Sequence, residues 1–311
     1  MVEKSRLKQS KQKKKKRRWL KITGIVSLVL ILGICGYVYS IYHNAKQTVN
    51  EQMKRELPSI DIERTKEKVA EKEKLNILLL GVDKRPGDRG RSDTMIILTL
   101  DPRANKMQMI SIPRDTRTLI VGKGFEDKIN HAYAFGGPDM SVATVENMLN
   151  IDIDYFVEIN MDGLVKLVDA VGGITVYNEL DWHSDGFHYA PGELHLNGKQ
   201  ALGYVRMRKQ DPQGDFGRTK RQRQVIEAII KKGVSVASVP KINDMLDILG
   251  DNVATNMDFD DMKDLLLNYR NSAQNTETYM LQGKGTRING IYYYIVPEEE
   301  LAKVHEMIAS K

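Results

Sequence analysis

Apolar residues in the chain occur either in short continuous runs or at helical spacing. The runs LNILLLGV from Leu75, TMIILTLD at 94–101 and KMQMISI at 106–112 are typical of buried strands, and a turn joins the last two. YFVEIN and ITVYN also predict strands, whereas SVATVENMLN, MDGLVKLVDAV, NGKQALGYV and RTKRQRQVIEAIIKKG have helical periodicity. Amphipathic segments follow near 241–249 and 258–270. Strands alternating with helices predict an α/β layered fold, with the strand order open.

An uncharged stretch, ITGIVSLVLILGICGYVYSIY, occupies residues 22–42. At about 1.5 Å per residue it is long enough to cross the roughly 30 Å hydrocarbon core of a bilayer. Trp19 precedes it and tyrosines end it, as is typical of membrane interfaces. A cleaved signal peptide is the alternative, but its apolar region is usually only about 7–15 residues long. We therefore expect a single-pass cell-membrane anchor.

The net charge of +6 is divided unevenly along the chain. Residues 1–21 contain eleven Lys and Arg against Glu3, so the rest of the chain is mildly acidic. A basic tail next to a membrane span is expected to stay in the cytoplasm, which places the remainder outside the cell. An acidic domain offers no large footprint for a phosphate backbone, so we expect no nucleic acid partner.

Residues 43–74 are rich in charge and poor in large apolar side chains. They predict a partly helical stalk with a break at Pro58. The only cysteine, Cys35, lies in the apolar stretch, so the exported part has no disulfide and depends on its hydrophobic core. The predicted organisation is a basic tail at 1–21, a span at 22–42, a stalk at 43–74 and a catalytic domain at 75–311.

Two carboxylates flank the loop GVDKRPGDRGRSDT after the first strand. Asp83 follows that strand and Asp93 precedes the next. If the two strands are neighbours, both carboxylates converge at one end of the sheet, where they could hold a hard divalent cation. Turn chemistry is the alternative, because Asp, Gly and Pro are the residues that turns use.

Arginines gather at the predicted ends of strands and helices. Arg206 and Arg208 alternate in YVRMR and point the same way if that stretch is extended. Arg218 and Gln222 begin the otherwise apolar face of a helix, and Arg218 is near its N-terminus, where the helix dipole disfavours a cation. Ion pairs with Asp101, Asp115, Asp211 and Asp215 could explain any single arginine. The whole set predicts a phosphate or other oxyanion site, formed by Arg85, Arg91, Arg114, Arg206, Arg208, Arg218 and Gln222.

Several other site classes have no support. No Walker loop is present, no GxGxxG opens a helix after a strand, and no serine has a G-x-S-x-G context. The six histidines show no metal-ligand spacing, so we expect them to be structural or exposed; they are His43, His131, His183, His188, His195 and His305.

Taken together, five stretches resemble the LytR-CpsA-Psr family of cell-wall enzymes. They are GVDKRPGDRGRSDTMI, SIPRDTR, DKINHAYAFGG, YFVEINMDGLVKLVDAVGGITV and GELHLNGKQALGYVRMRKQDPQGDFGRTKRQRQVI. The resemblance implies an extracytoplasmic three-layer αβα domain with a central mixed sheet. It also implies that the substrate is a glycopolymer linked to polyisoprenyl pyrophosphate. In the branch of the family that the chain resembles most, this polymer is wall teichoic acid. The lipid part would lie in an apolar tunnel.

The resemblance also implies roles for individual residues. Asp83 and Asp93 would hold Mg²⁺, with Mn²⁺ as a substitute, and the arginines and Gln222 would contact the pyrophosphate. Arg91, Arg114, Arg206 and Arg218 would act in catalysis, whereas Asp115 has no clear role. One carboxylate can hardly act both as a metal ligand and as a general base, so no general base is assigned.

The implied reaction is phosphotransfer. A peptidoglycan hydroxyl attacks the phosphorus that carries the polymer, and polyisoprenyl phosphate leaves. Arginines and metal would stabilise the charge that develops on the phosphoryl oxygens. Hydrolysis of the same pyrophosphate by water is the enzymatic alternative. A membrane-bound transcriptional regulator is a weaker one, since only the basic tail favours it.

Overall fold

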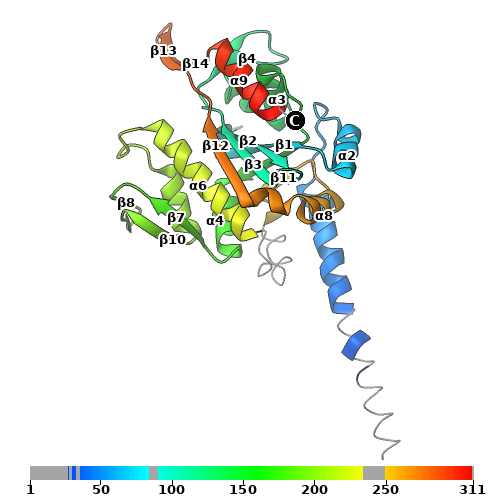
Figure 1. Cartoon of the computed structure of the whole chain (residues 1–311). Coiled ribbons are helices and arrows are strands. Elements are labelled where there is room, and N and C mark those ends of the chain that lie inside the picture. The colour runs from blue at the N-terminus through cyan, green and yellow to red at the C-terminus, as the bar shows by residue number, and fades with distance from the viewer. Residues whose placement is uncertain (1–26, 28–29, 33–35, 84–89, 234–248, 310–311) are drawn as a thin grey trace, which may run out of the picture. The chain divides into compact units, whose positions relative to one another are not determined.

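The computed structural model describes residues 27, 30–32, 36–83, 90–233 and 249–309 (Figure 1). The chain divides into two compact units, residues 1–46 and 47–311. In the first unit the described residues are helical, and they include only part of the predicted span at 22–42. Among the described residues, no helix combines the length and the hydropathy needed to cross a membrane.

The second unit begins at Gln47, well before Leu75. Helix η1 (Thr48–Met53) buries Val49 and Met53, and Lys54 forms a β-bridge with Thr255. Helix α2 (Ile62–Glu71) follows the turn at Pro58 and packs Val69 against the sheet. Residues 47–74 are therefore part of the folded unit and not a separate stalk. This stretch has few apolar residues, but those that pack against the rest of the unit, such as Val49, Met53 and Val69, are buried.

A six-stranded mixed sheet forms the centre of the second unit, in the order β11-β6-β1-β2-β3-β12. Strand β1 runs parallel to β6, and β3 runs parallel to β12, while the other neighbours are antiparallel. The central mixed sheet is thus confirmed. Its strands are β1 (Leu75–Asp83), β2 (Arg91–Asp101), β3 (Lys106–Ser111), β6 (Tyr155–Asn160), β11 (Val253–Thr255) and β12 (Asn275–Met280).

Helices cover both faces of this sheet, which explains why its strands are continuous apolar runs. Leu78 and Leu80 pack with α3 (His131–Leu149) and α9 (Glu298–Ala309), whereas Leu75 and Ile77 face the opposite layer. That layer contains α2, α6 (Asp215–Gly233), α8 (Phe259–Asn268) and the short helix η3 (Arg270–Gln274). Figure 1 shows α3 and α9 on one side of the sheet and α4 and α6 on the other.

A second hydrophobic cluster lies beside the sheet. It joins α4 (Met161–Ala170), α5 (Gly198–Arg206) and part of α6 to the ribbon of β7 (Ile174–Asn178) and β10 (Gly192–Leu196) and the hairpin of β8 (Trp182–Ser184) and β9 (Phe187–Tyr189). Two more hairpins complete the described fold, β4 (Arg117–Leu119) with β5 (Glu126–Lys128) and β13 (Lys284–Ile288) with β14 (Ile291–Ile295).

The helices predicted from periodicity are present, with different bounds. Helix α3 starts ten residues earlier than SVATVENMLN and is kinked at Gly136 and Gly137. Helix α6 starts at Asp215, three residues before the predicted Arg218. The amphipathic segment near 241–249 lies, except for Leu249, outside the described residues.

Candidate functional site

The predicted carboxylates lie at one edge of the sheet, where β1 ends and β2 begins. These strands are antiparallel neighbours, so the condition for their convergence is met. Ser92 pairs with Val82 and Thr94 pairs with Gly81, which leaves Asp93 as the extra residue of a β-bulge. A bulge redirects a side chain and interrupts the ladder, and bulges are common next to active sites. The chain therefore places Asp93 by a local irregularity of β2.

Arg114 follows β3 and reaches the same edge. Its Nη1 donates a hydrogen bond to Asp93 Oδ1 at 2.7 Å. Its Nε lies 3.7 Å from Asp215 Oδ2 and 3.8 Å from Asp115 Oδ2. Burial alone would lower the pKa of Arg114, but the bond to Asp93 and the other carboxylates raise it overall. Arg114 is therefore a fixed cation at the centre of the site.

Helix α6 contributes a second group of charges. Arg218 Nη2 lies 2.7 Å from Asp215 Oδ1, and Arg208 Nε lies 3.5 Å from the same oxygen. The Arg218 side chain is only 12% exposed, and burial lowers the pKa of its guanidinium. Asp215 in the first turn also offsets the unfavourable position of Arg218 near the helix N-terminus.

Some donors of this cluster are unsatisfied. Within the described part of the chain, the buried Nε atoms of Arg114 and Arg218 have no hydrogen-bond partner. A buried donor without a partner costs free energy, so such atoms are expected where a ligand supplies the acceptor. An oxyanion fits here, because guanidinium forks match phosphate oxygens.

Arg223 is a cation that the sequence analysis missed. It lies on α6, and its Nη1 donates to Ser111 Oγ at 3.0 Å, at the end of β3. Burial lowers its pKa, and no carboxylate of the described residues pairs with it. The alternating RQRQ pattern is the only feature of the sequence that could have pointed to Arg223. It did not do so, because Arg223 is not on the apolar face of the helix that contains Gln222. Arg223 increases the positive charge next to the sheet edge.

An open cavity of about 520 Å³ adjoins these charges. Arg114, Arg208 and Lys128 line it, and Lys128 Nζ bonds Asp115 Oδ1 at 2.7 Å. Asp115 thus orients a lysine, a contact that the motif alone did not reveal. Tyr292 of β14 contributes an aromatic wall. The cavity combines fixed cations with a surface suited to a polar ligand.

Other predicted arginines form no ion pair with the carboxylates of this cluster within the described part of the chain. Arg206 is the last residue of α5, so YVRMR is not extended; it is exposed and has no ion pair with any described residue. Arg91 is exposed at the start of β2, opposite Asp83. Arg85 lies outside the described residues. The structure thus brings Asp93, Arg114, Arg208 and Arg218 together.

Two of the proposed structural ion pairs involve other partners. Asp211 pairs with Arg221, and both side chains are buried. Asp101 pairs with Lys74 at 3.3 Å and accepts backbone hydrogen bonds within its own turn. Asp115 and Asp215, by contrast, are the carboxylates that contact the arginines of the site.

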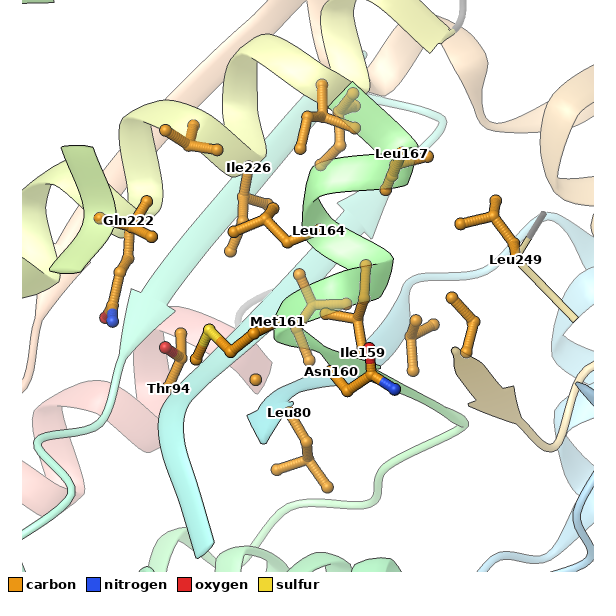
Figure 2. Close-up of a pocket in the computed structure, with 18 of the residues that line it drawn as sticks. Leu80, Thr94, Ile159, Asn160, Met161, Leu164, Leu167, Gln222, Ile226 and Leu249 are labelled. Carbon is orange, nitrogen blue, oxygen red and sulfur yellow. The ribbon is translucent and has the colours of Figure 1, made fainter. Parts of the chain in front are cut away.

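An apolar cavity of about 270 Å³ lies between the sheet, α4 and α6 (Figure 2). Side chains such as Leu164, Ile226 and Leu249 line it. Gln222 and Thr94 lie at one side of the cavity, and Leu249 lies at the other. Thr94 follows Asp93 in β2, and Gln222 lies one helical turn after Arg218. The polar end of the cavity is therefore adjacent to the charged cluster.

A match to a family of known proteins fits this combination of sites. A family model described as the LytR_cpsA_psr family matches residues 35–310. The chain belongs to this family. A relative from Bacillus subtilis (strain 168), the polyisoprenyl-teichoic acid–peptidoglycan teichoic acid transferase TagU, is 46% identical over 96% of this chain and 97% of its own.

Solved structures with the same fold are also similar to this chain. A protein from Enterococcus faecalis described as a transcriptional regulator is 39% identical over 77% of this chain and 88% of its own, with a TM-score of 0.71. TagT bound to LIIa-WTA is 31% identical over 83% of this chain and 95% of its own, with a TM-score of 0.66. The described αβα architecture is thus that of the LytR_cpsA_psr family.

Proposed function

We propose that the protein is an enzyme that transfers a teichoic acid from a polyisoprenyl pyrophosphate carrier to peptidoglycan. Full-length relatives named as teichoic acid transferases support this function. The observation that carries it is the adjacency of two different sites, a cluster of arginines that includes the half-buried Arg114 and Arg218, and an apolar cavity that meets it at Gln222 and Thr94. A lipid pyrophosphate is an amphiphile with these two halves.

The chemistry follows from the charges. The acceptor hydroxyl attacks the phosphorus that bears the polymer, a phosphodiester forms, and the bond to polyisoprenyl phosphate breaks. Arg114 and Arg218 lie in fixed positions in which their unsatisfied Nε donors can meet phosphoryl oxygens. Preorganised donors stabilise the charge that develops in such a transition state, and each is worth about 10²–10³ in rate. Energy comes from the pyrophosphate, so no nucleotide is required.

Asp83 and Asp93 fit a magnesium or manganese ion by the chemistry of their donors. Both provide carboxylate oxygens, which hard cations prefer, at the ends of adjacent strands. Asp93 uses Oδ1 for Arg114, and its Oδ2 has no partner among the described residues. When bound, such an ion supplies positive charge to the phosphoryl and leaving-group oxygens.

We also propose that the second unit works outside the cell, held by the apolar stretch at 22–42 with the basic tail in the cytoplasm. The uncharged length of that stretch and the charge of residues 1–21 support this topology. A membrane position suits a substrate whose carrier is a lipid. Protease accessibility in intact protoplasts tests it, since protection of the domain would favour the regulator hypothesis instead.

The decisive experiment uses the full chain in detergent with a lipid-pyrophosphate-linked glycan, peptidoglycan and magnesium. We expect release of polyisoprenyl phosphate together with polymer bound to the wall. Arg218→Ala should slow both by about 100-fold or more. Arg103→Ala is the matched control, because Arg103 lies in the β2–β3 turn at the opposite edge of the sheet and contacts the carbonyl of Glu71.

Two outcomes would contradict the proposal. Equal rates for wild type and Arg218→Ala would exclude the arginine cluster as the reaction site. Free polymer phosphate without attachment to the wall would identify water as the acceptor and the enzyme as a hydrolase.

A further inference from the structure

Hairpin β8–β9 has one buried and one exposed face. Trp182 and Tyr189 point into the second hydrophobic cluster, where their rings stack with centroids 3.8 Å apart. Because side chains alternate along a strand, the neighbouring His183 and His188 project from the other face. Asp181, two residues before His183, shares that exposed face. The packing of the buried face fixes the position of the hairpin and therefore of the side chains on its exposed face.

The register of the hairpin places the two imidazoles opposite each other. Asp185 and Gly186 have φ values of 50° and 80°, as in a two-residue type I′ turn, and His183 pairs directly with His188. Their rings are parallel with centroids 4.3 Å apart. His188 Nε2 lies 3.1 Å from Asp181 Oδ1. The two histidines and the carboxylate are therefore gathered by backbone pairing.

We propose that this hairpin binds zinc or a similar divalent transition metal ion through Asp181, His183 and His188. Ligand atoms of the three residues lie within 4.8 Å of one another. Ligand atoms around tetrahedral zinc are about 3.3 Å apart, so small rotations of exposed side chains close the site. Water completes the coordination, since three ligands come from the described residues of the hairpin.

The donor set separates this site from the one at Asp83 and Asp93. Imidazole nitrogens favour zinc, copper or nickel, whereas magnesium requires oxygen ligands. His183 and His188 are exposed, as the sequence predicted. Their spacing was not identified as a possible metal site, because it is set by a hairpin and not by a helix or a known motif. Cross-strand pairing is invisible in a count of intervening residues.

The exposed site is also connected to the rest of the domain. Gln210 Nε2 donates to the carbonyl of His183 at 3.2 Å, and the Tyr189 hydroxyl donates to the carbonyl of Gln200 at 2.9 Å. A metal ion that bridges the strands is bound only when the hairpin is folded. Zinc therefore stabilises the folded protein as well as binding to it.

The test measures zinc binding to the full chain in detergent by competition with a chromophoric chelator, and cobalt binding by visible absorption. We expect one ion per chain, and a cobalt spectrum typical of nitrogen and oxygen ligands. Losing a residue that only hydrogen-bonds a metal ligand typically lowers metal affinity by about 10- to 100-fold. His183→Ala and His188→Ala each remove a ligand itself, so they should lower zinc affinity by more than that. Asp181→Asn should lower zinc affinity less, because the amide oxygen can still coordinate the metal, although weakly.

His195→Ala is the matched control. His195 is exposed and lies 3.7 Å from Glu193, so it has one imidazole and one carboxylate but no second histidine. Its replacement should leave zinc affinity unchanged. A wild-type dissociation constant above about 1 mM, or equal zinc affinity in wild type and both histidine variants, would overturn the proposal. If a variant folds poorly, copper spectra of the wild type give the number of imidazoles bound to the metal. Fewer than two bound imidazoles would overturn the proposal.

Discussion

Replacing Asp211 should destabilise the protein and loosen the segment that carries Arg208. Arg221 Nη1 donates to Asp211 Oδ2 at 2.5 Å, and the two side chains are 6% and 3% exposed. Arg221 also donates to the carbonyls of Tyr204 and Met207 at the end of α5. Asp211 therefore neutralises a buried cation that fixes the connection between α5 and α6.

The size of the effect can be worked out from these contacts. Removing one partner of a buried ion pair typically costs about 3–5 kcal/mol, because the other charge stays buried without compensation. Arg221 keeps its two carbonyl acceptors in Asp211→Ala, so we expect the lower end, about 3 kcal/mol. For a domain of this size that corresponds to a fall of roughly 6–12 °C in the thermal midpoint.

Urea unfolding of the wild type, Asp211→Ala, Arg221→Met and the double variant tests this in a double-mutant cycle. The double variant should lose roughly 2 kcal/mol less than the sum of the single losses. Gly217→Ala provides an independent perturbation, since its Cβ would clash with Asp211 Oδ2 and displace the carboxylate. Additive losses, or a loss below about 1 kcal/mol for Asp211→Ala, would refute the reasoning.

Three further predictions concern the cavity, the site and a buried carboxyl. Leu164→Trp should fill the apolar cavity and slow turnover of a long polyisoprenyl substrate by roughly 10-fold or more, while a short-chain analogue in the same lipid phosphate assay reacts normally. Arg223→Met should lower transfer by about 100-fold yet keep or raise the urea midpoint, because a partly buried charge without a carboxylate partner among the described residues disappears; a lower midpoint would contradict this. Burial raises the pKa of Glu146 from 4.5 to about 7, so the folded state holds this proton more tightly and stability falls as pH rises through that window. The free energy of unfolding of Glu146→Gln should therefore exceed that of the wild type by about 2 kcal/mol above about pH 8 and equal it near about pH 4. An equal gain in stability at both pH values would exclude this carboxyl as the cause.

The central sheet could be predicted because its strands are buried on both faces. Continuous apolar runs such as LNILLLGV mark such strands, and helical spacing marked α4, α5 and α6. Short strands like β11 and β8 carry too few residues for a pattern. The start of the folded unit was missed because Val49, Met53 and Val69 are spaced among many charged residues.

The site could be predicted only as a set of residue types. Asp93, Arg114 and Arg218 were identified from their places at the ends of elements, and the structure joins them. Asp215, which holds Arg208 and Arg218, appeared in the sequence only as one possible counter-ion. A bulge at Asp93 depends on one extra residue in one strand, and no periodicity reveals it.

The turn between β2 and β3 offers a place for a spectroscopic reporter. Arg103, Ala104 and Asn105 are exposed there, at the end of β2 opposite Asp93. Eight strand residues at about 3.3 Å each separate the turn from the charged cluster by roughly 26 Å. A fluorophore attached at Ala104 would thus lie within range of energy transfer to a labelled lipid, without touching the groups that bind it.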